Sequence, residues 1–426
     1  MKVNVFWFRR DLRLKDNLGL NAALLSKNPV LGIFIFDNKI TCNLPKDDAR
    51  ISFIYKNLKK INKNLGFANS SLLVKKGNAL EVFNELIKVY EIESVYSNVD
   101  YEPYAIDRDF KISSFLSLNK INHLQFKDQV VFEPKEVLKD DGLPYTVYTP
   151  YKNKWLSKYQ QNPISTSKTV DLSNFYKFNY NFPLFTDLGF IDSNIKVVDY
   201  NLDSIQNYAN DRDYPFLNSG SYLSVHLRFG TVSVREVILQ LESTDSVFLS
   251  ELIWREFFMM IIYHFPNAKN SNFKKKYDKV KWNNSKQDFQ NWCDGKTGYP
   301  IVDAGMIELN NTGYMHNRIR MIVAGFLCKH LLIDWRWGEK YFSLKLLDYE
   351  LSSNNGNWQW AAGTGCDSAP YFRIFNPFTQ QKKFDKDLLY IKKWINNYDK
   401  DNYIDYIVDH DMARKRALAA YKLGLQ

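Results

Sequence analysis

Asparagine, glycine and tryptophan are concentrated at residues 354–360, which read Asn-Asn-Gly-Asn-Trp-Gln-Trp. Indole rings gain nothing from contact with water, so a segment with two of them is expected to be buried or to bind something. Residues 361–365 read Ala-Ala-Gly-Thr-Gly and let the backbone approach a flat surface. Residues 370–377 then place Arg373 between aromatic side chains. The composition therefore indicates a buried or ligand-bound segment rather than a solvated helix.

A second polar segment lies at residues 314–321, where charged and amide side chains alternate with apolar ones at helical spacing. Polar groups on an apolar helix need partners. On residue types alone, an ion-pair network that holds helices together is the alternative to a ligand site. Two further motifs combine aromatic with charged residues, at 254–257 (Trp-Arg-Glu-Phe) and at 7–13.

The elements that position these residues fall into two kinds. Residues 1–130 alternate short β-rich runs with amphipathic stretches, which predicts βαβ units on a parallel sheet. The β-rich runs are Val3–Phe8, Val30–Phe36, Leu72–Lys75, Val95–Ser97 and Leu124–Phe126, and the amphipathic stretches are Ile51–Leu65 and Ala79–Tyr90. No G-x-G-x-x-G follows the first run, so a dinucleotide site of the usual Rossmann type is not supported. Arg9, Arg10 and Arg13 follow it instead, either as ligand contacts or as domain-docking contacts.

Residues 131–204 are rich in proline and irregular, which predicts a linker wrapped over the surface, with residues 145–155 packed down by their aromatic side chains. Helical periodicity dominates from residue 205 onward and predicts buried helices. These are Val234–Leu241, Phe248–His264, Met306–Leu309, Met315–Leu332, Lys340–Leu351 and Arg414–Lys422.

Length and composition are those of a globular protein with two domains or one large one. The 426 residues are 45% hydrophobic and 16% aromatic, which is ample for packed cores. The net charge of +10 favours a polyanionic partner but is weak evidence alone. Four widely spaced cysteines indicate neither a zinc site nor a disulfide framework. Without a signal sequence or a membrane-spanning run, we expect a cytoplasmic protein with no membrane contact.

Residues 298–376, together with the motifs at 254–257 and 7–13, resemble the photolyase/cryptochrome family. The closest likeness is to class I cyclobutane pyrimidine dimer (CPD) DNA photolyases, over nearly the whole chain. The resemblance implies an α/β N-terminal domain with a Rossmann-like parallel sheet at 1–130 and an interdomain linker at 131–204. It also implies an all-α domain that binds FAD and DNA at 205–426. The implied activity is a deoxyribodipyrimidine photo-lyase, a carbon-carbon lyase driven by blue light, without a metal.

The resemblance assigns two groups of residues to FAD. Small hydroxylated residues at 220–224 open a helix, where N–H groups can face a phosphate or simply form an N-cap. In the family this segment binds pyrophosphate, although Tyr222 stands where an arginine is usual. Asn354 is placed near flavin N5 and an Arg320–Asp348 pair beside the isoalloxazine. The predicted FAD-binding residues are Tyr208, Ser221, Leu223, Ser224, Arg255, Asn317, Arg320, Asp348, Glu350 and Asn354.

The substrate that the resemblance implies is a pyrimidine dimer flipped out of double-stranded DNA, which costs less than flipping a normal base. Its predicted catalytic residues are Glu251, Trp254, Asn317, Met321 and Trp360, and its DNA-binding residues are Arg212, Glu251, Trp254, Arg318, Trp360 and Arg373. Glu251 between apolar neighbours is expected to be protonated and to hydrogen-bond the dimer. Lysine runs at 274–276 and 382–383 are candidate phosphate contacts, although such runs are more often solvated faces.

Three tryptophans, Trp282, Trp335 and Trp358, match the electron-relay triad of the family. The methenyltetrahydrofolate antenna site is not matched, because residues 40–47 lack the expected histidine and Tyr104-Ala105 replaces an Asn-Glu pair. A second chromophore stays uncertain.

We expect a monomer. The alternative function is a cryptochrome, a blue-light receptor that signals through a protein partner, and a third is a helical nucleic-acid-binding protein without flavin. Signalling members often carry long C-terminal extensions, whereas this sequence ends at Gln426 soon after its last expected helix.

Overall fold

The computed structural model describes residues 1–167, 171–399 and 401–426. The chain divides into two compact units. The sheet unit comprises Met1–Val137, Trp155–Tyr200 and Leu223–Glu242, and the helical unit comprises Leu138–Lys154, Asn201–Tyr222 and Ser243–Gln426. The chain thus passes between the units several times, and the domain boundaries predicted at 130 and 204 stay predictions.

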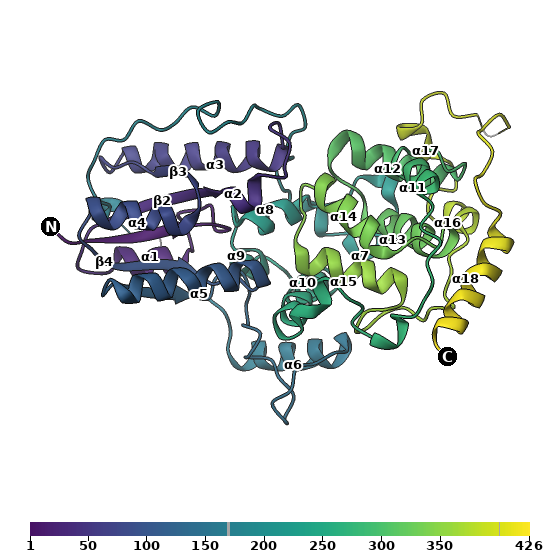
Figure 1. The fold of residues 1–426 in the computed structure, drawn as a ribbon, viewed down its shortest axis with the longest axis horizontal. Coiled ribbons are helices and arrows are strands. Elements are labelled where there is room, and N and C mark those ends of the chain that lie inside the picture. Colours follow the sequence, from purple (N-terminus) through teal and green to yellow (C-terminus); the bar gives the residue numbers. More distant parts are fainter. Residues whose placement is uncertain (168–170, 400) are drawn as a thin grey trace. The chain divides into compact units, whose positions relative to one another are not determined.

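The sheet unit contains five parallel strands in the order β3-β2-β1-β4-β5 (Figure 1). Their bounds are β1 Val3–Phe8, β2 Val30–Asp37, β3 Leu73–Gly77, β4 Ile92–Asn98 and β5 Asn122–Phe126. Every run predicted as a strand is found within two residues of its start, except that β4 begins three residues earlier. The predicted fold class, a parallel α/β sheet followed by a helix-rich region, is confirmed.

Helices cover both faces of this sheet (Figure 1). Val5 and Trp7 share an apolar cluster with α4 and α5, whereas Phe6 lies close to Gly19 of α1, because successive side chains of a strand alternate between faces. The helices of the sheet unit are α1 Leu18–Leu24, α2 Asn38–Thr41, α3 Ala49–Gly66, α4 Ala79–Val89, α5 Pro103–Leu118, α8 Leu223–Phe229 and α9 Val234–Leu239.

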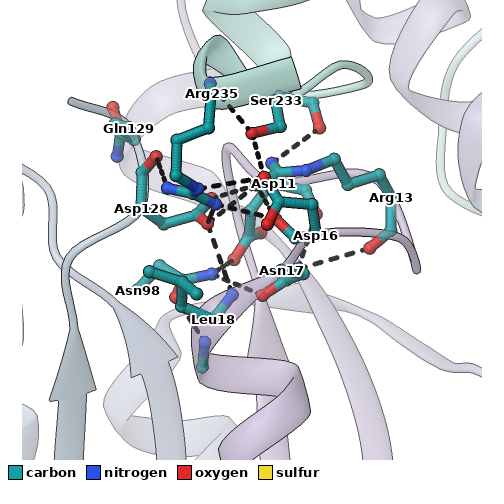
Figure 2. Close-up of polar contacts among 12 residues, drawn as sticks. Asp11, Arg13, Asp16, Asn17, Leu18, Asn98, Asp128, Gln129, Ser233 and Arg235 are labelled. Atoms are coloured by element: carbon teal, nitrogen blue, oxygen red, sulfur yellow. Dashed lines mark hydrogen bonds and ion pairs between the residues drawn. The ribbon is translucent and has the colours of Figure 1, made fainter. Parts of the chain in front are cut away.

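A buried ion network ties the segment 223–242 to the strands of the sheet unit (Figure 2). Arg235 bonds Asp16 at 2.9 Å and Asp128 at 2.8 Å, and Arg13 bonds Asp128 at 2.7 Å. Burial raises the pKa of the Asp128 carboxyl, but the two guanidinium groups outweigh burial and lower that pKa. Breaking such a buried pair would leave an uncompensated charge, so the network holds the segment in place.

The arginines that follow β1 are engaged within the sheet unit. Arg9 pairs with Asp109 and Arg10 with Asp100, in addition to the Arg13 pair. These ion pairs lie within one unit and correspond to neither the ligand contacts nor the domain-docking contacts that the sequence suggested.

The helical unit consists of helices that share one large apolar core. They are α7 Tyr208–Asp211, α10 Ser246–His264, α11 Lys286–Cys293, α12 Pro300–Thr312, α13 Asn317–Gly325, α14 Trp335–Lys345, α15 Leu351–Ala362, α16 Pro377–Phe384, α17 Leu389–Trp394 and α18 His410–Gly424. A π-helical turn, Phe326–His330, directly follows α13. Within the described ranges, no helix is long and apolar enough to cross a membrane.

Four local differences from the sequence-based expectation stand out. Helix α6, Tyr148–Gln161, lies inside the segment predicted as irregular, and α5 was not predicted. The helix predicted over 315–332 changes to π-helical geometry at Phe326. The helix predicted over 340–351 ends at Lys345, and α15 begins at Leu351. Helix α15 contains the Asn-Gly-Asn-Trp motif, and Asn354, Trp358 and Gln359 in it are buried, as its composition predicts.

Two glycines let α15 pack closely on its neighbours. A Cβ at Gly356 would lie 2.1 Å from Cδ1 of Phe258 in α10, and one at Gly338 of α14 would lie 2.1 Å from Cη2 of Trp358. Real Cβ atoms do not approach so closely, so any larger residue would push the helices apart. These two contacts fix α15 between α10 and α14.

Candidate active site

Many of the predicted flavin-facing and dimer-facing residues lie on α10, α13 and α15, and α15 packs on both of the other helices. Helix α10 carries Glu251, Trp254 and Arg255, and α13 carries the segment 317–321. Helix α13 begins where the His316 side chain accepts a hydrogen bond from the Arg318 backbone N–H, which is the arrangement of a helix N-cap. The fold therefore gathers side chains that are far apart in the sequence.

Two ion pairs connect the predicted flavin-facing residues. Arg320 Nη2 lies 2.9 Å from Asp348 Oδ2, and its Nε donates to the Met315 carbonyl at 2.8 Å. The Asp348 carboxyl is 8% exposed and the Arg320 side chain 29%. Arg255 Nη2 lies 3.2 Å from Glu350 Oε1. The pairing predicted between Arg320 and Asp348 is present.

Asn354 is held in a fixed orientation by its amide nitrogen. Nδ2 donates to the Glu339 carbonyl at 3.1 Å and to Glu339 Oε1 at 2.9 Å. Burial raises the pKa of the Glu339 carboxyl, which the bond from Asn354 partly opposes. Two residues before Asn354 on α15, Ser352 Oγ is buried without a hydrogen-bond partner among the described residues. A buried hydroxyl without a partner is the exception in folded proteins, and a bound group could supply the missing partner.

This donor set fits FAD. Its pyrophosphate and its reduced isoalloxazine are anionic, and Arg255 and Arg320 supply cations while Asn354 supplies an oriented amide. The residues predicted for the pyrophosphate divide between the units. Tyr208 and Ser221 belong to the helical unit, whereas Leu223 and Ser224 begin α8 of the sheet unit.

Tyr222, the departure from the family pattern, has a structural partner of its own. Its hydroxyl donates to Asn218 Oδ1 at 2.5 Å, its ring meets Tyr314 edge-on at 5.2 Å, and its φ is 53°. Its left-handed backbone conformation is uncommon for a large side chain and indicates a locally constrained turn. The pyrophosphate contacts therefore stay a prediction.

Charged residues predicted to meet DNA pair with acidic residues at this site. Arg212 Nη1 donates to Glu251 Oε1 at 2.7 Å, and Arg318 Nη2 donates to Asp213 Oδ1 at 2.6 Å. The carboxyl of Glu251 thus has a cationic partner, Arg212, in place of the purely apolar neighbours expected from the sequence. Burial, followed by the Glu251 charge, raises the pKa of Tyr208 to about 12.

Trp254 stacks on a residue that the sequence did not identify. The Tyr148 ring lies parallel to the Trp254 ring, with centroids 3.6 Å apart and an interplanar angle of 8°. The Tyr148 hydroxyl donates to the Ser250 carbonyl at 2.6 Å, and its backbone N–H donates to Asp367 Oδ2 at 3.0 Å. Tyr148 therefore covers one face of Trp254 and fixes its plane. The aromatic run at 145–155 was the only sequence signal for this contact.

The remaining predicted site residues keep some solvent access. Trp254, Met321 and Trp360 are partly buried, whereas Asn317 and Arg373 are exposed. Arg318 Nη1 lies 3.7 Å from the Met321 sulfur. The roles assigned to these side chains stay predictions.

The innermost tryptophan of the predicted relay is buried in the core. Trp358 is 2% exposed, and its ring packs directly against Gly338. The same ring meets the Phe342 ring edge-on, with centroids 5.0 Å apart. Trp292, outside the predicted triad, meets Trp358 at 6.1 Å.

Backbone pairing brings the other two relay residues into neighbouring segments. The N–H of Asn283, next to Trp282, donates to the Leu332 carbonyl at 2.7 Å, close to the start of α14 at Trp335. The Trp335 indole donates to Asn272 Oδ1 at 2.8 Å. Trp335 and Trp358 are both buried, whereas Trp282 is partly exposed, and the relay stays a prediction.

Comparison with known proteins gives consistent matches along the chain. Residues 248–401 match the family described as the FAD binding domain of DNA photolyase, and residues 4–169 match DNA photolyase. The chain is 35% identical to the deoxyribodipyrimidine photo-lyase of Vibrio cholerae, and the match covers 99% of this chain and 99% of that protein.

Two solved structures are similar over the full length. A class III photolyase from Agrobacterium tumefaciens has a TM-score of 0.87 and 32% identity, covering 100% of this chain and 98% of that one. An archaeal photolyase from Sulfolobus tokodaii with two FAD molecules has a TM-score of 0.84 and 32% identity, covering 99% and 100%.

Proposed function

The chain belongs to the DNA photolyase family, and from this premise we propose that it repairs cyclobutane pyrimidine dimers in DNA with light, using reduced FAD. The observation that carries the proposal is the contact between α10 and α15 at Phe258 and Gly356. This contact supports the proposal because it places α10, which carries residues assigned to the dimer, directly against α15, which carries a residue assigned to the flavin. Electron transfer between two bound groups requires that proximity.

When bound and reduced, FAD supplies an electron to the dimer upon excitation by light. The residues of the chain bind, orient and compensate charge. Two arginines would place positive charge at the isoalloxazine: Arg320, which is paired with Asp348, and Arg255, which is paired with Glu350. Asn354 would present an amide in a fixed orientation. Because these groups are held before light arrives, they need not reorganise when charge moves.

The dimer is held by flat apolar surfaces and by oriented polar groups. Trp254, fixed by Tyr148, offers its ring to one base, and Trp360 offers a second ring. Arg212 and Glu251 form a pair that can open when DNA binds, so that Glu251 turns toward the base edges and Arg212 toward the DNA backbone. Selectivity follows because a dimer pairs and stacks poorly in duplex DNA and leaves it at low cost.

DNA is the partner that the charge distribution favours. Arg373 is exposed beside Phe375, and Lys382 and Lys383 are exposed on α16. Contacts of this type are sequence-independent and weaken as salt rises. The relay of Trp282, Trp335 and Trp358 would supply an electron from the surface when the cofactor is oxidised, and it is not needed once the cofactor is reduced.

The finer assignments within the family also belong to this proposal. Class I likeness is our prediction, and the similar Agrobacterium structure is a class III photolyase. A similar cryptochrome from Synechocystis is 22% identical and shows only a shared fold. We favour repair over signalling because the strongest full-length relatives are photo-lyases.

The test is direct. The purified protein is mixed with a reductant and an oligonucleotide that contains one thymine dimer, and restored thymines are counted after illumination and in the dark. We expect thymines only in the illuminated sample. A coloured, flavin-containing protein that restores none under light would favour the photoreceptor alternative, and a colourless one would refute both.

A further inference from the structure

A pocket in the sheet unit lies next to the carboxyl end of β5. Its volume is about 310 Å³, at the lower end of the range for small-molecule sites. It is lined by the start of α1 at Leu18, residues 127–136 after β5, the end of α6 at Lys158, and residues 162–165. Ligands of open α/β sheets bind at the carboxyl ends of the strands, which is the side on which this pocket lies.

The apolar part of the lining is buried. Val130, Val131 and Phe132 are 2%, 4% and 5% exposed, and the Phe132 ring packs edge-on against Trp155 of α6 with centroids 5.3 Å apart. Ile164 adds a further aliphatic side chain to the lining. A ligand loses water on these walls, so the part of it that enters must itself be apolar.

Two lysine ammonium groups supply the polar part of the lining. Lys127 Nζ lies 2.7 Å from Glu136 Oε2, and Lys158 Nζ donates to the Glu136 carbonyl at 2.7 Å. The two Nζ atoms lie 5.8 Å and 5.2 Å from the centre of the Phe132 ring. Both ammonium groups are therefore held close to one ring and to one acidic residue.

Each ammonium keeps hydrogen-bond donors for a ligand. An ammonium has three N–H donors, and each of these lysines forms one hydrogen bond with the residues that the structure describes. The side chains of Lys127 and Glu136 are 34% and 33% exposed, so a small molecule can reach them from solvent. Glu136 Oε2 also accepts the Glu133 N–H at 2.6 Å, which fixes this carboxylate beside Lys127.

The charges at the pocket favour a ligand with one negative charge. Arg235 also lines the pocket, but its guanidinium donates to Asp16 and Asp128, which compensate it. The two lysines and Glu136 then leave one net positive charge. A singly charged carboxylate with an apolar body matches this lining better than a doubly charged phosphate, because uncompensated charge against apolar walls is costly.

We propose that this pocket binds a small organic carboxylate. The apolar body of the ligand packs against Val130, Val131 and Ile164, and its carboxylate accepts hydrogen bonds from Lys127 Nζ and Lys158 Nζ. Such charge-assisted hydrogen bonds are stronger than neutral ones and fix the orientation of the ligand. The proposal concerns the sheet unit alone and does not depend on dimer repair.

A purely structural role of the lysines has a different signature. Lys158 would only fasten the Glu136 carbonyl to α6, and Lys127 would only pair with the Glu136 side chain. Partly exposed ion pairs of this kind contribute little to stability. Such a role allows a small change in thermal stability when either lysine is replaced, but it gives the protein no affinity for a carboxylate. Ligand binding therefore separates the two roles.

The probe is 1-naphthoate, a flat aromatic carboxylate, titrated by calorimetry into the flavin-containing protein in the dark. We expect a Kd of about 1 mM or lower, as for other ligands of this size. 1-Naphthalenemethanol has the same rings without the charge and should bind at least about tenfold more weakly. Inorganic phosphate at the concentration of the probe should not displace it.

Variants locate the binding. Lys127→Met and Lys158→Met keep the length of the side chain and remove its charge, so each should weaken binding at least about fivefold. Ile164→Trp keeps both lysines and fills the pocket, so it should abolish binding. Lys154→Met is the matched control, because Lys154 is exposed on the same helix, outside the pocket, and should bind the probe as the wild type does.

Two results would overturn the proposal outright. One is a wild type that binds no 1-naphthoate at about 10 mM, which is tenfold above the weakest Kd expected. The other is a folded double variant, Lys127→Met with Lys158→Met, that binds the probe as tightly as the wild type. Phosphate that displaces the probe completely would also overturn it, because the pocket would then be a site for inorganic anions.

Discussion

Substitution of Gly338 tests the close packing of α14 against Trp358 in the helical unit. A Cβ there would lie 2.1 Å from Cη2 and 2.4 Å from Cζ3 of Trp358, and 2.6 Å from Cδ2 of Leu327. Carbon atoms in contact are normally about 3.5–4.0 Å apart, so Gly338→Ala must displace the indole by more than about 1 Å. We expect the helical unit to be destabilised and Trp358 to leave its position in the relay.

The magnitude follows from two opposed effects. Glycine to alanine inside a helix normally gains about 0.5–1 kcal/mol, whereas overpacking a core typically costs about 1–3 kcal/mol and occasionally more. The overlap at Gly338 involves two ring carbons and a methyl group, which favours the upper part of that range. We therefore expect a net loss of about 1–2 kcal/mol. Gly66, at the end of α3 with nothing within 4 Å of its Cβ position, is the matched control and should gain stability.

The assay compares thermal unfolding of the flavin-containing wild type, Gly338→Ala and Gly66→Ala, together with the rate of light-driven flavin reduction. A loss of about 1–2 kcal/mol corresponds to a fall of roughly 2–8 °C in the unfolding midpoint. Flavin reduction should slow in Gly338→Ala and stay unchanged in Gly66→Ala. If Gly338→Ala unfolded at the wild-type temperature and reduced its flavin at the wild-type rate, the close packing of α14 on Trp358 would be refuted.

Three further perturbations test other parts of the site. Burial, followed by the Arg320 charge, lowers the pKa of His316 from its usual 6.5 to about 4. The folded protein therefore loses up to about 3 kcal/mol of stability as the pH falls from about 6.5 to about 4. His316→Asn keeps the N-cap and should abolish that loss in unfolding curves, and an unchanged pH profile would assign the loss to another group. Arg212→Met should weaken binding to damaged DNA and reduce the salt slope by about 1 in a titration series, and an unchanged slope would exclude a phosphate contact. Tyr148→Ala should lower dimer affinity about fivefold because Trp254 loses its stacked partner, whereas Tyr148→Phe should not, and equal affinities would show that the stack is unimportant.

Much of the fold follows from local patterns in the sequence. The strands of the sheet unit are short runs of β-branched and aromatic residues separated by amphipathic stretches, so β1 through β5 were predictable. The segment of α15 was expected to be buried because of its tryptophans, and it is. Helix α6 was missed because the prolines around it mark an irregular segment, while its own periodicity is weak.

The candidate site was predictable in composition but not in its contacts. The Arg320–Asp348 pair was expected from the resemblance and is present. The stack of Tyr148 on Trp254 joins residues that are distant in sequence, and no local pattern specifies such a pair.

The central claim is that the helical unit holds FAD close enough to a flipped dimer for an electron to pass between them. The most direct measurement is the fluorescence lifetime of the reduced cofactor in this protein with a dimer-containing oligonucleotide, compared with the same oligonucleotide after repair. We expect a clearly shortened lifetime with the dimer and an unchanged lifetime with the repaired strand. Equal lifetimes at saturating amounts of both oligonucleotides would contradict it.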